Sequence, residues 1–252
     1  MKPTCLTLIP LFAVMGCKDV KTAEKPLPQP APVHDSLPPA PSQANAKARK
    51  TFEPYVSEQY ADSTQIGIKG KNKVELKVIT SPDTMYADIR FYAKENQKWI
   101  EKQHLTWPYE ATACNPKYAD FNNDGHNDFT FKTINTARGG NDARILFMYN
   151  KQSGLLKPIK NSDNYSNLHY NNRLNCIDAW ALHGGTTTSF LSIDADTLHL
   201  FASVNVFDGQ LEVHRYNKNG KETLIQQKAY NEDFPRFKNF DPLEEYTEAD
   251  FK

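Results

Sequence analysis

Polar and apolar residues alternate with a period of two through much of this chain, and that period limits its fold more than any other feature. Successive side chains of a β-strand point to opposite faces of the sheet, so the alternation predicts half-buried strands. No stretch beyond about residue 63 combines the helical period with helix caps. The predicted strands are residues 73–80 (KVELKVIT), 85–93 (MYADIRFYA), 98–105 (KWIEKQHL), 129–134, 144–149, 197–204 and 211–216.

Short turn sequences separate these predicted strands. They are Gly70-Lys71-Asn72, Glu95-Asn96, Gln152-Ser153-Gly154, Asp208-Gly209 and Asn219-Gly220. Asp-Gly and Asn-Gly suit the positive φ angles of tight hairpins, so consecutive strands are expected to pair antiparallel. We therefore predict an all-β domain over residues 56–230, built of antiparallel strands and hairpins as a sandwich or a small propeller-like array.

The first 17 residues have the form of a lipoprotein signal peptide. An apolar run from Leu6 to Met15 leads to Gly16 and Cys17. The run is about 10 residues long, whereas a membrane-spanning helix needs roughly 20. Its end, VMGC, resembles the lipobox of bacterial lipoproteins, whose cysteine is acylated and becomes the new N-terminus. Cys17 is therefore the expected lipidation site, and an ordinary signal peptide with an incidental cysteine is the alternative.

Residues 18–55 are expected to form a disordered tether. As far as Lys50 the segment is rich in Pro, Ala and Lys and contains no Phe, Trp or Tyr. Such a composition buries too little apolar surface to offset the entropy of ordering the chain. Lys18 follows Cys17, at the position where Asp retains enteric lipoproteins in the inner membrane. The expected location is therefore the bacterial envelope, lipid-anchored in the outer membrane and facing the periplasm.

Two cysteines remain after the signal peptide, Cys114 and Cys176. In an oxidising envelope, two leftover thiols are more often paired than free. A Cys114–Cys176 disulfide is therefore expected, with two free thiols as the alternative.

The distribution of charge excludes one class of partner. The chain has 30 Lys and Arg residues against 30 Asp and Glu residues, and no basic patch is interleaved with aromatic residues. A nucleic-acid partner is therefore not expected. Residues 231–252 (NEDFPRFKNFDPLEEYTEADFK) are acidic and dotted with aromatics, and we expect them to form an acidic C-terminal tail.

Residues 120–128 (DFNNDGHND) have the spacing of a calcium-binding loop. Written D-x-N-x-D-G-x-x-D, the loop places the side-chain oxygens of Asp120, Asn122, Asp124 and Asp128 at positions 1, 3, 5 and 9, while His126 at position 7 offers its backbone carbonyl. Ca²⁺ takes roughly six to eight oxygen ligands, and alternate residues of a curled loop can supply them. An Asn/Asp turn without an ion is the alternative.

The loop differs from that of an EF-hand. An EF-hand closes with a bidentate Glu at position 12, where this chain has Phe131. Because an alternating strand follows, the loop is expected to lie between strands and to be closed by Asp128, directly or through water. A multi-oxygen cage suits Mg²⁺ less well than Ca²⁺. His126 has no second His or Cys at ligand spacing, so a transition metal is not expected.

The segment from residue 118 to about residue 225 resembles a family of bacterial calcium-binding envelope lipoproteins that act as immunity proteins against peptidoglycan-degrading effectors. The features that carry the resemblance are the DFNNDGHNDF loop, which is also similar to the loops of FG-GAP blades, the linker Arg138-Gly139-Gly140, the hairpin RILFMYNKQSGLLKPI and the closing strands SIDADTLHLFASVNVFDGQLEVHRYNKNGKETLI. The resemblance implies the fold and the calcium ion. It carries no contact residue over to this chain.

The sequence contains no motif of an enzyme active site. Neither a Gly-x-Ser-x-Gly elbow nor a His-Glu-x-x-His helix occurs. His183-Gly184-Gly185 is similar to the oxyanion segment of esterases, but no nucleophile motif accompanies it, so we interpret it as a loop. We therefore expect a protein that is not an enzyme and that has no catalytic residues.

The expected function is to bind and inhibit a peptidoglycan hydrolase, which would be a cell-wall hydrolase or a secreted toxin. Lysozyme-like enzymes are often cationic, so an acidic segment gains association rate from complementary charge. The candidate contacts are residues 231–252 and the loop around residues 183–188. The alternative is a non-enzymatic binding or scaffolding module for glycan or an outer-membrane complex.

Overall fold

The computed structural model describes residues 53–111, 113–134 and 139–251. The chain divides into two units, residues 1–49 and residues 50–252, and the described residues all belong to the second. The predicted signal peptide, the lipidation site Cys17 and the predicted tether as far as residue 52 lie outside the described residues.

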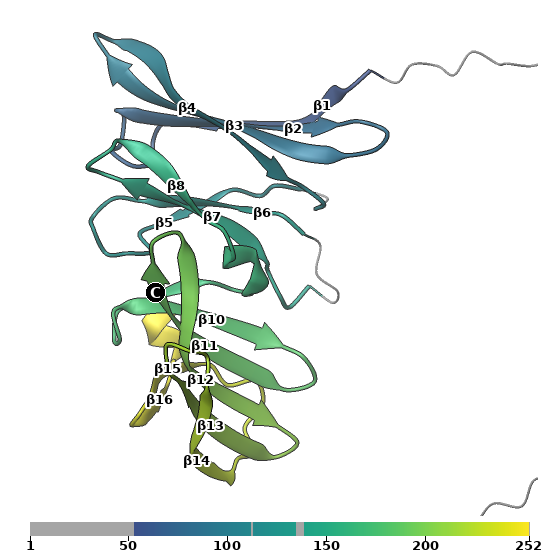
Figure 1. Cartoon of the computed structure of the whole chain (residues 1–252), viewed down its shortest axis with the longest axis vertical. Helices are drawn as coiled ribbons and strands as arrows, with labels where there is room; N and C mark the ends of the chain where they lie inside the picture. The colour runs from purple at the N-terminus through teal and green to yellow at the C-terminus, as the bar shows by residue number, and fades with distance from the viewer. Residues whose placement is uncertain (1–52, 112, 135–138, 252) are drawn as a thin grey trace, which may run out of the picture. The chain divides into compact units, whose positions relative to one another are not determined.

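The described part of the chain contains sixteen β-strands, two short 3-10 helices and no α-helix, which confirms the predicted all-β class (Figure 1). None of its helices is long and apolar enough to cross a membrane. The 3-10 helices are η1 (Ser162–Asn164) and η2 (Glu248–Phe251). The strands are β1 (Tyr55–Asp62), β2 (Asn72–Thr80), β3 (Met85–Glu95), β4 (Lys98–Pro108), β5 (Lys117–Ala119), β6 (Asp128–Lys132), β7 (Arg144–Asn150), β8 (Leu155–Ile159), β9 (His169–Asn171), β10 (Cys176–Leu182), β11 (Thr186–Asp194), β12 (Thr197–Phe207), β13 (Gln210–Tyr216), β14 (Glu222–Ala229), β15 (Phe237–Phe240) and β16 (Leu243–Glu245).

Each strand predicted from the period of two is present, and each predicted turn lies at a strand connection. Asp208 and Gly209 have φ angles of 49° and 72° between β12 and β13, the positive values that a tight Asp-Gly hairpin requires. Asn96 and Gln97 do the same between β3 and β4, with φ angles of 47° and 65°. The hairpin prediction is therefore confirmed at both positions.

The strands form four antiparallel sheets, each made of consecutive strands. Their orders are β1-β2-β3-β4, β5-β6-β7-β8, β14-β13-β12-β11-β10-β9 and β15-β16. Three hydrophobic clusters accompany these sheets, one between each neighbouring pair in chain order. A sandwich packs two sheets around one core, whereas this chain has four sheets with a separate cluster between each neighbouring pair.

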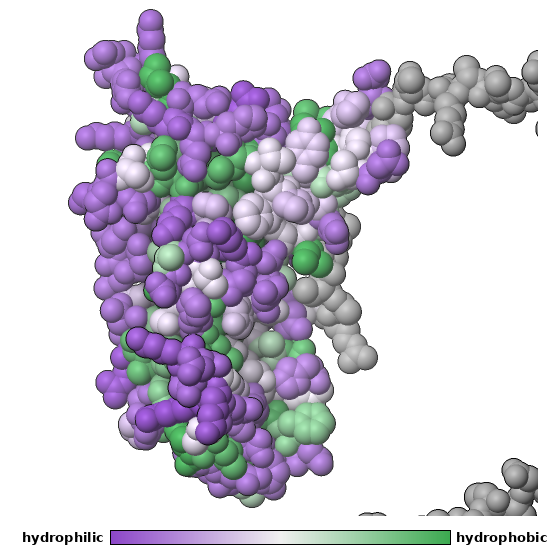
Figure 2. All heavy atoms as spheres, viewed as in Figure 1, coloured by the Kyte–Doolittle hydropathy of each residue, from purple (hydrophilic) through white to green (hydrophobic). Residues whose placement is uncertain are grey.

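β7 explains how the second sheet supports two of the clusters. Ile145, Phe147 and Tyr149 pack into the first cluster, with β2 and β3. Leu146 and Met148 point the other way and pack into the second cluster, with β10 and β11. Each large apolar side chain buried in this way contributes roughly 1.5–3 kcal/mol to folding. The surface is mainly hydrophilic on the face that Figure 2 shows, with smaller hydrophobic areas between polar ones.

The C-terminal segment is folded and does not project as the acidic tail that we expected. Phe237 of β15 is fully buried in the third cluster, beside Phe190 and Val204. Asn239 is buried on the same face of β15, and Phe240 packs against the cluster's edge. The acidic composition of the segment concealed this alternation. Residues 231–251 therefore belong to the all-β unit.

Cys114 and Cys176 are both free thiols, so the expected disulfide is not formed in the structure. The physical reason is their placement: Cys114 is buried in the first cluster, whereas Cys176 packs against the third. Burial raises the pKa of each thiol to about 12, which keeps both protonated and unreactive at neutral pH.

Candidate functional site

The predicted calcium loop connects β5 to β6, so it lies between two strands as expected. Ala119 and Asp128 pair across the base of the loop. Asn123 and Gly125 have φ angles of 56° and 83°, which curl the backbone tightly between them.

Three polar side chains converge on the inside of this curl. The two carboxylate oxygens of Asp120 accept hydrogen bonds from the backbone nitrogens of Asp124 (3.1 Å) and Gly125 (2.8 Å). Asn122 Oδ1 lies 3.2 Å from the same Asp124 nitrogen, and its Nδ2 donates to Asp124 Oδ2 at 3.2 Å. The loop therefore gathers Asp120, Asn122 and Asp124 as the sequence predicts. All three side chains lie on partly or fully exposed residues.

Asp128 lies at the base of the loop and is bonded to the backbone on both sides. Its side chain is fully buried, and its Oδ1 and Oδ2 accept hydrogen bonds from the backbone nitrogens of Tyr149 (2.9 Å) and Phe121 (2.8 Å). Burial, with a smaller contribution from repulsion by Asp124 and Asp120, raises the pKa of this carboxyl to about 7 against the opposing effect of these two bonds. Asp128 thus joins the loop to β7.

The donor set fits a hard cation only in part. Among the described residues, no three His, Cys, Asp or Glu side chains form a ready ligand cluster. The oxygens of Asp120, Asn122 and Asp124 are of the kind that Ca²⁺ prefers, and each keeps a second lone pair beyond its backbone hydrogen bond. The His126 ring packs edge-on against Tyr149, with the ring centroids 5.6 Å apart. The ring of His126 is therefore not a candidate ligand. The backbone carbonyl of His126 is the candidate, as the sequence predicts.

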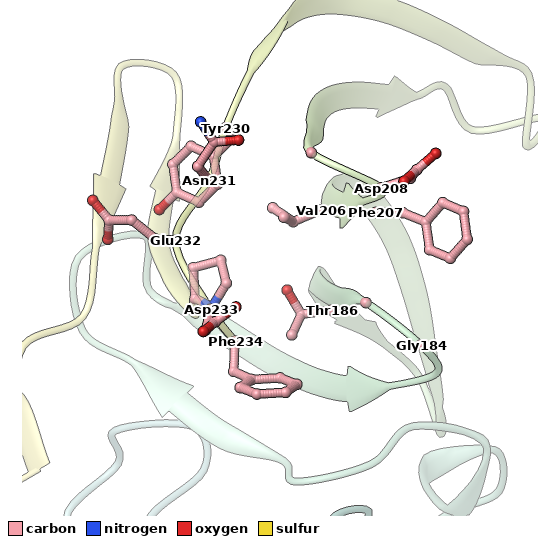
Figure 3. A pocket seen from close by; sticks show the side chains of 13 residues that line it. Gly184, Thr186, Val206, Phe207, Asp208, Tyr230, Asn231, Glu232, Asp233 and Phe234 are labelled. Carbon is pink, nitrogen blue, oxygen red and sulfur yellow. The ribbon is translucent and has the colours of Figure 1, made fainter.

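A second candidate site is a pocket of about 300 Å³ at which both predicted contact segments meet (Figure 3). One wall is residues 184–186, from the turn between β10 and β11. The opposite wall is residues 230–235, which lead from β14 towards β15, and residues 206–209 complete the lining. The sequence predicted the two segments as contacts but not that they share one pocket.

The backbone of the pocket is held in place from both sides. Trp180 Nε1 donates to the carbonyl of Pro235 at 2.8 Å, and the nitrogen of Phe237 donates to Thr188 Oγ1 at 3.1 Å. Gly185 passes so close to β12 that an added Cβ would lie 2.1 Å from the Val206 carbonyl oxygen. His183-Gly184-Gly185 is therefore the tight connection of a hairpin, which agrees with its interpretation as a loop.

The lining combines aromatic and acidic side chains. Phe207 is 59% exposed and Phe234 is 65% exposed, high values for side chains of this size. The acidic residues are Asp208, Glu232 and Asp233, and none of the thirteen described residues of the lining is basic. Sequence reasoning missed Phe207 and Phe234, because a single apolar residue beside a turn gives no signal of its exposure.

A buried charge cluster attaches the C-terminal wall of the pocket to the third sheet. Asp178 of β10 is fully buried. It accepts hydrogen bonds from Arg236 Nε at 2.9 Å and from the Tyr246 hydroxyl at 2.5 Å. His169 Nδ1 lies 3.6 Å from Asp178 Oδ2, the oxygen that also accepts the Tyr246 bond. These contacts fix the residues on either side of β15 and β16.

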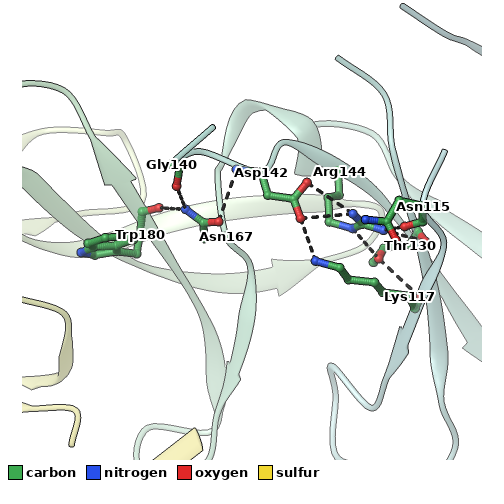
Figure 4. Close-up of polar contacts among 8 residues, drawn as sticks. All are labelled: Asn115, Lys117, Thr130, Gly140, Asp142, Arg144, Asn167 and Trp180. Carbon is green, nitrogen blue, oxygen red and sulfur yellow. Dashed lines mark hydrogen bonds and ion pairs between the residues drawn. The ribbon is translucent and has the colours of Figure 1, made fainter. Parts of the chain in front are cut away.

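A second polar network joins the second and third sheets (Figure 4). Arg144 is buried, donates from Nε to Thr130 Oγ1 at 2.9 Å and forms an ion pair with Asp142 at 3.1 Å. Asn167 Nδ2 lies 2.9 Å from each of two acceptors, the carbonyl oxygens of Gly140 and Trp180. Trp180 also contacts the pocket wall, so this network positions the pocket relative to β7.

Comparison with known proteins gives distant structural likeness and no relative by sequence. No family profile matches the chain, and no curated protein matches it. Among solved structures, the chain is similar to a Xanthomonas type IV secretion system related protein, at 13% sequence identity and a TM-score of 0.42. That match covers 69% of this chain and 99% of the other.

Proposed function

We propose that this chain is an exported lipoprotein that binds and inhibits a peptidoglycan hydrolase. The observation that carries the proposal is the pocket formed by residues 184–186, 206–209 and 230–235, which presents two exposed phenylalanines and three carboxylates. Aromatic side chains on a rigid frame are typical anchors of protein interfaces. The carboxylates complement the positive charge that is common in lysozyme-like enzymes.

The proposed anchor is the lipid on Cys17, which places the all-β unit in the periplasm at the outer membrane. Calcium has a structural role in this proposal. Bound by Asp120, Asn122 and Asp124, with the His126 carbonyl, it offsets the repulsion among the loop carboxylates and holds the β5–β6 connection rigid. Asp128 supports the site from beneath through its bonds to Phe121 and Tyr149.

Calcium is expected to stabilise the protein against heat. At about 100 times its dissociation constant, a ligand that binds only the folded state adds about 2.7 kcal/mol, which corresponds to a rise in melting temperature of about 5–10 °C. The Asp120→Ala/Asp124→Ala variant should lose this rise. Its matched control, Asp83→Ala/Glu110→Ala, removes two exposed carboxylates outside the loop and should keep it. An equal response in both variants would remove the calcium site.

Photo-crosslinking tests the proposed partner. A photoreactive benzoylphenylalanine at Phe207 should capture a hydrolase from envelope extract, and the same group at Ile100, an exposed residue of β4, should not. The captured enzyme, once purified, should release less soluble peptidoglycan when this chain is present. A partner with no activity on peptidoglycan, or equal capture at both positions, would contradict the proposal.

A further inference from the structure

Thr186 is a buried hydroxyl at the base of the pocket. Thr186 is only 1% exposed, and its Oγ1 has no hydrogen-bond partner in the structure. Buried hydroxyls are normally bonded, because an unmet one costs roughly 1–3 kcal/mol. Figure 3 shows this hydroxyl directed into the pocket. Its hydrogen-bonding capacity is therefore unused within the fold.

The two threonines that follow show that this situation is particular to Thr186. Thr187 Oγ1 donates to Asn205 Oδ1 at 2.9 Å, and Thr188 Oγ1 accepts the backbone N–H of Phe237 at 3.1 Å. Both hydroxyls are thus used within the fold. A ligand that places a donor near Thr186 would supply the hydrogen bond that the Thr186 hydroxyl lacks.

The charge of the lining defines the ligand as a cation. Asp208 lies on one side of Thr186, and Glu232 and Asp233 lie on the other (Figure 3). Lys228 is near but outside the lining, with its Nζ 5.7 Å from the centroid of the Tyr230 ring. A group with several N–H donors and no acceptor suits an unbonded hydroxyl in a pocket whose lining has three acidic residues and no basic one.

The two exposed phenylalanines distinguish between the two basic side chains. A planar guanidinium stacks on aromatic rings and forms paired hydrogen bonds with carboxylates, whereas an ammonium is a compact, strongly hydrated charge. Phe207 and Phe234 flank the pocket and leave their rings to solvent. A volume of about 300 Å³ lies at the lower limit of ligand pockets, which suits one side chain and not a larger ligand.

We propose that the pocket receives an arginine side chain of the partner protein, with its guanidinium bonded to Thr186 and to a carboxylate of the lining and stacked on Phe207 or Phe234. This inference rests on the proposed function, because it names the group by which the partner is recognised. It assigns Thr186 as a binding residue and the two phenylalanines as the walls of an arginine site.

The test uses the isotope-labelled full chain and three small probes. In an NMR titration, acetyl-arginine-methylamide should shift the backbone amide resonances of the pocket residues until the shifts reach a plateau. Acetyl-citrulline-methylamide, which has the same shape without the charge, should bind at least about tenfold more weakly. Acetyl-lysine-methylamide should also bind more weakly. Equal binding of the citrulline or lysine probe, or shifts centred elsewhere, would overturn the inference.

The Thr186→Val variant separates binding from folding. It replaces the unbonded hydroxyl with a methyl group of similar size, so the melting temperature should stay the same or rise. Affinity for the arginine probe should fall about tenfold. Thr187→Val is the control and should retain it. If Thr186→Val binds the probe as well as the native chain does, Thr186 is not part of the site.

The two proposals fail in different ways. If the arginine probe does not bind but the crosslinked hydrolase is still inhibited, and inhibition is lost in Phe207→Ala/Phe234→Ala, the arginine inference is wrong and the proposed function stands. If the native chain inhibits no hydrolase while the arginine probe still binds, the pocket is an arginine site and the proposed function is wrong.

Discussion

Replacing Asp178 with alanine should lower the free energy of unfolding by about 3–5 kcal/mol. The Asp178 carboxylate is fully buried and accepts hydrogen bonds from Arg236 and Tyr246. Its removal leaves the mostly buried Arg236 guanidinium without that counter-charge. The residues that Arg236 fixes continue into the wall of the pocket, so partner binding should fall together with stability.

Urea denaturation of Asp178→Ala measures this loss directly. Asp196→Ala is the matched control, because it removes one carboxylate from a more exposed ion pair, in which Lys160 Nζ lies 2.7 Å from Asp196 Oδ2. The control should lose no more than about 1 kcal/mol. A loss below about 1 kcal/mol in Asp178→Ala as well would show that the C-terminal segment is held by its apolar contacts alone.

The Asp128→Ala variant should be destabilised by about 2–4 kcal/mol even when a chelator removes calcium. Two buried backbone N–H groups, those of Phe121 and Tyr149, would lose their acceptor. Burial of the carboxylate, which raises the pKa of Asp128 to about 7, offsets part of the gain from these bonds in the native protein. The loss is therefore less than the sum of two unmet donors.

Two further variants define what Asp128 contributes. Asp128→Asn keeps the shape of the side chain but places an amide NH₂ group against one of the two donors, so it should be nearly as destabilised as Asp128→Ala. Asp124→Ala removes an exposed carboxylate and should cost less than about 1 kcal/mol in the same chelator. Equal stabilities of Asp124→Ala and Asp128→Ala would contradict the role of Asp128 as a support beneath the loop.

The sequence predicts those strands whose two faces differ. In β2 the side chains alternate between buried and half-buried positions, and the period of two follows from that placement. β14 is exposed along its whole length, so no alternation marks it. β7 is buried on both faces, and its residues form a continuous apolar run that identifies a strand without saying which sheets will cover it.

The candidate sites differ in how far the sequence predicts them. The predicted calcium loop is local, since its candidate donors fall within nine residues, and its spacing alone predicts the convergence of Asp120, Asn122 and Asp124. The pocket is made by three connections that are distant in the chain, and the sheet formed by β10, β11, β12, β13 and β14 brings them together. Thr186 is one of three consecutive threonines, and no local pattern distinguishes the one that lacks a partner.

The most direct test of the central claim uses the hydrolase identified by crosslinking, purified in its free form. Its release of soluble peptidoglycan is measured as this chain is added. Activity should fall towards zero near an equimolar ratio, and Phe207→Ala/Phe234→Ala, with its melting temperature unchanged, should need at least about tenfold more protein for the same effect. Undiminished hydrolysis in excess native chain, or equal inhibition by the double variant, would contradict the account.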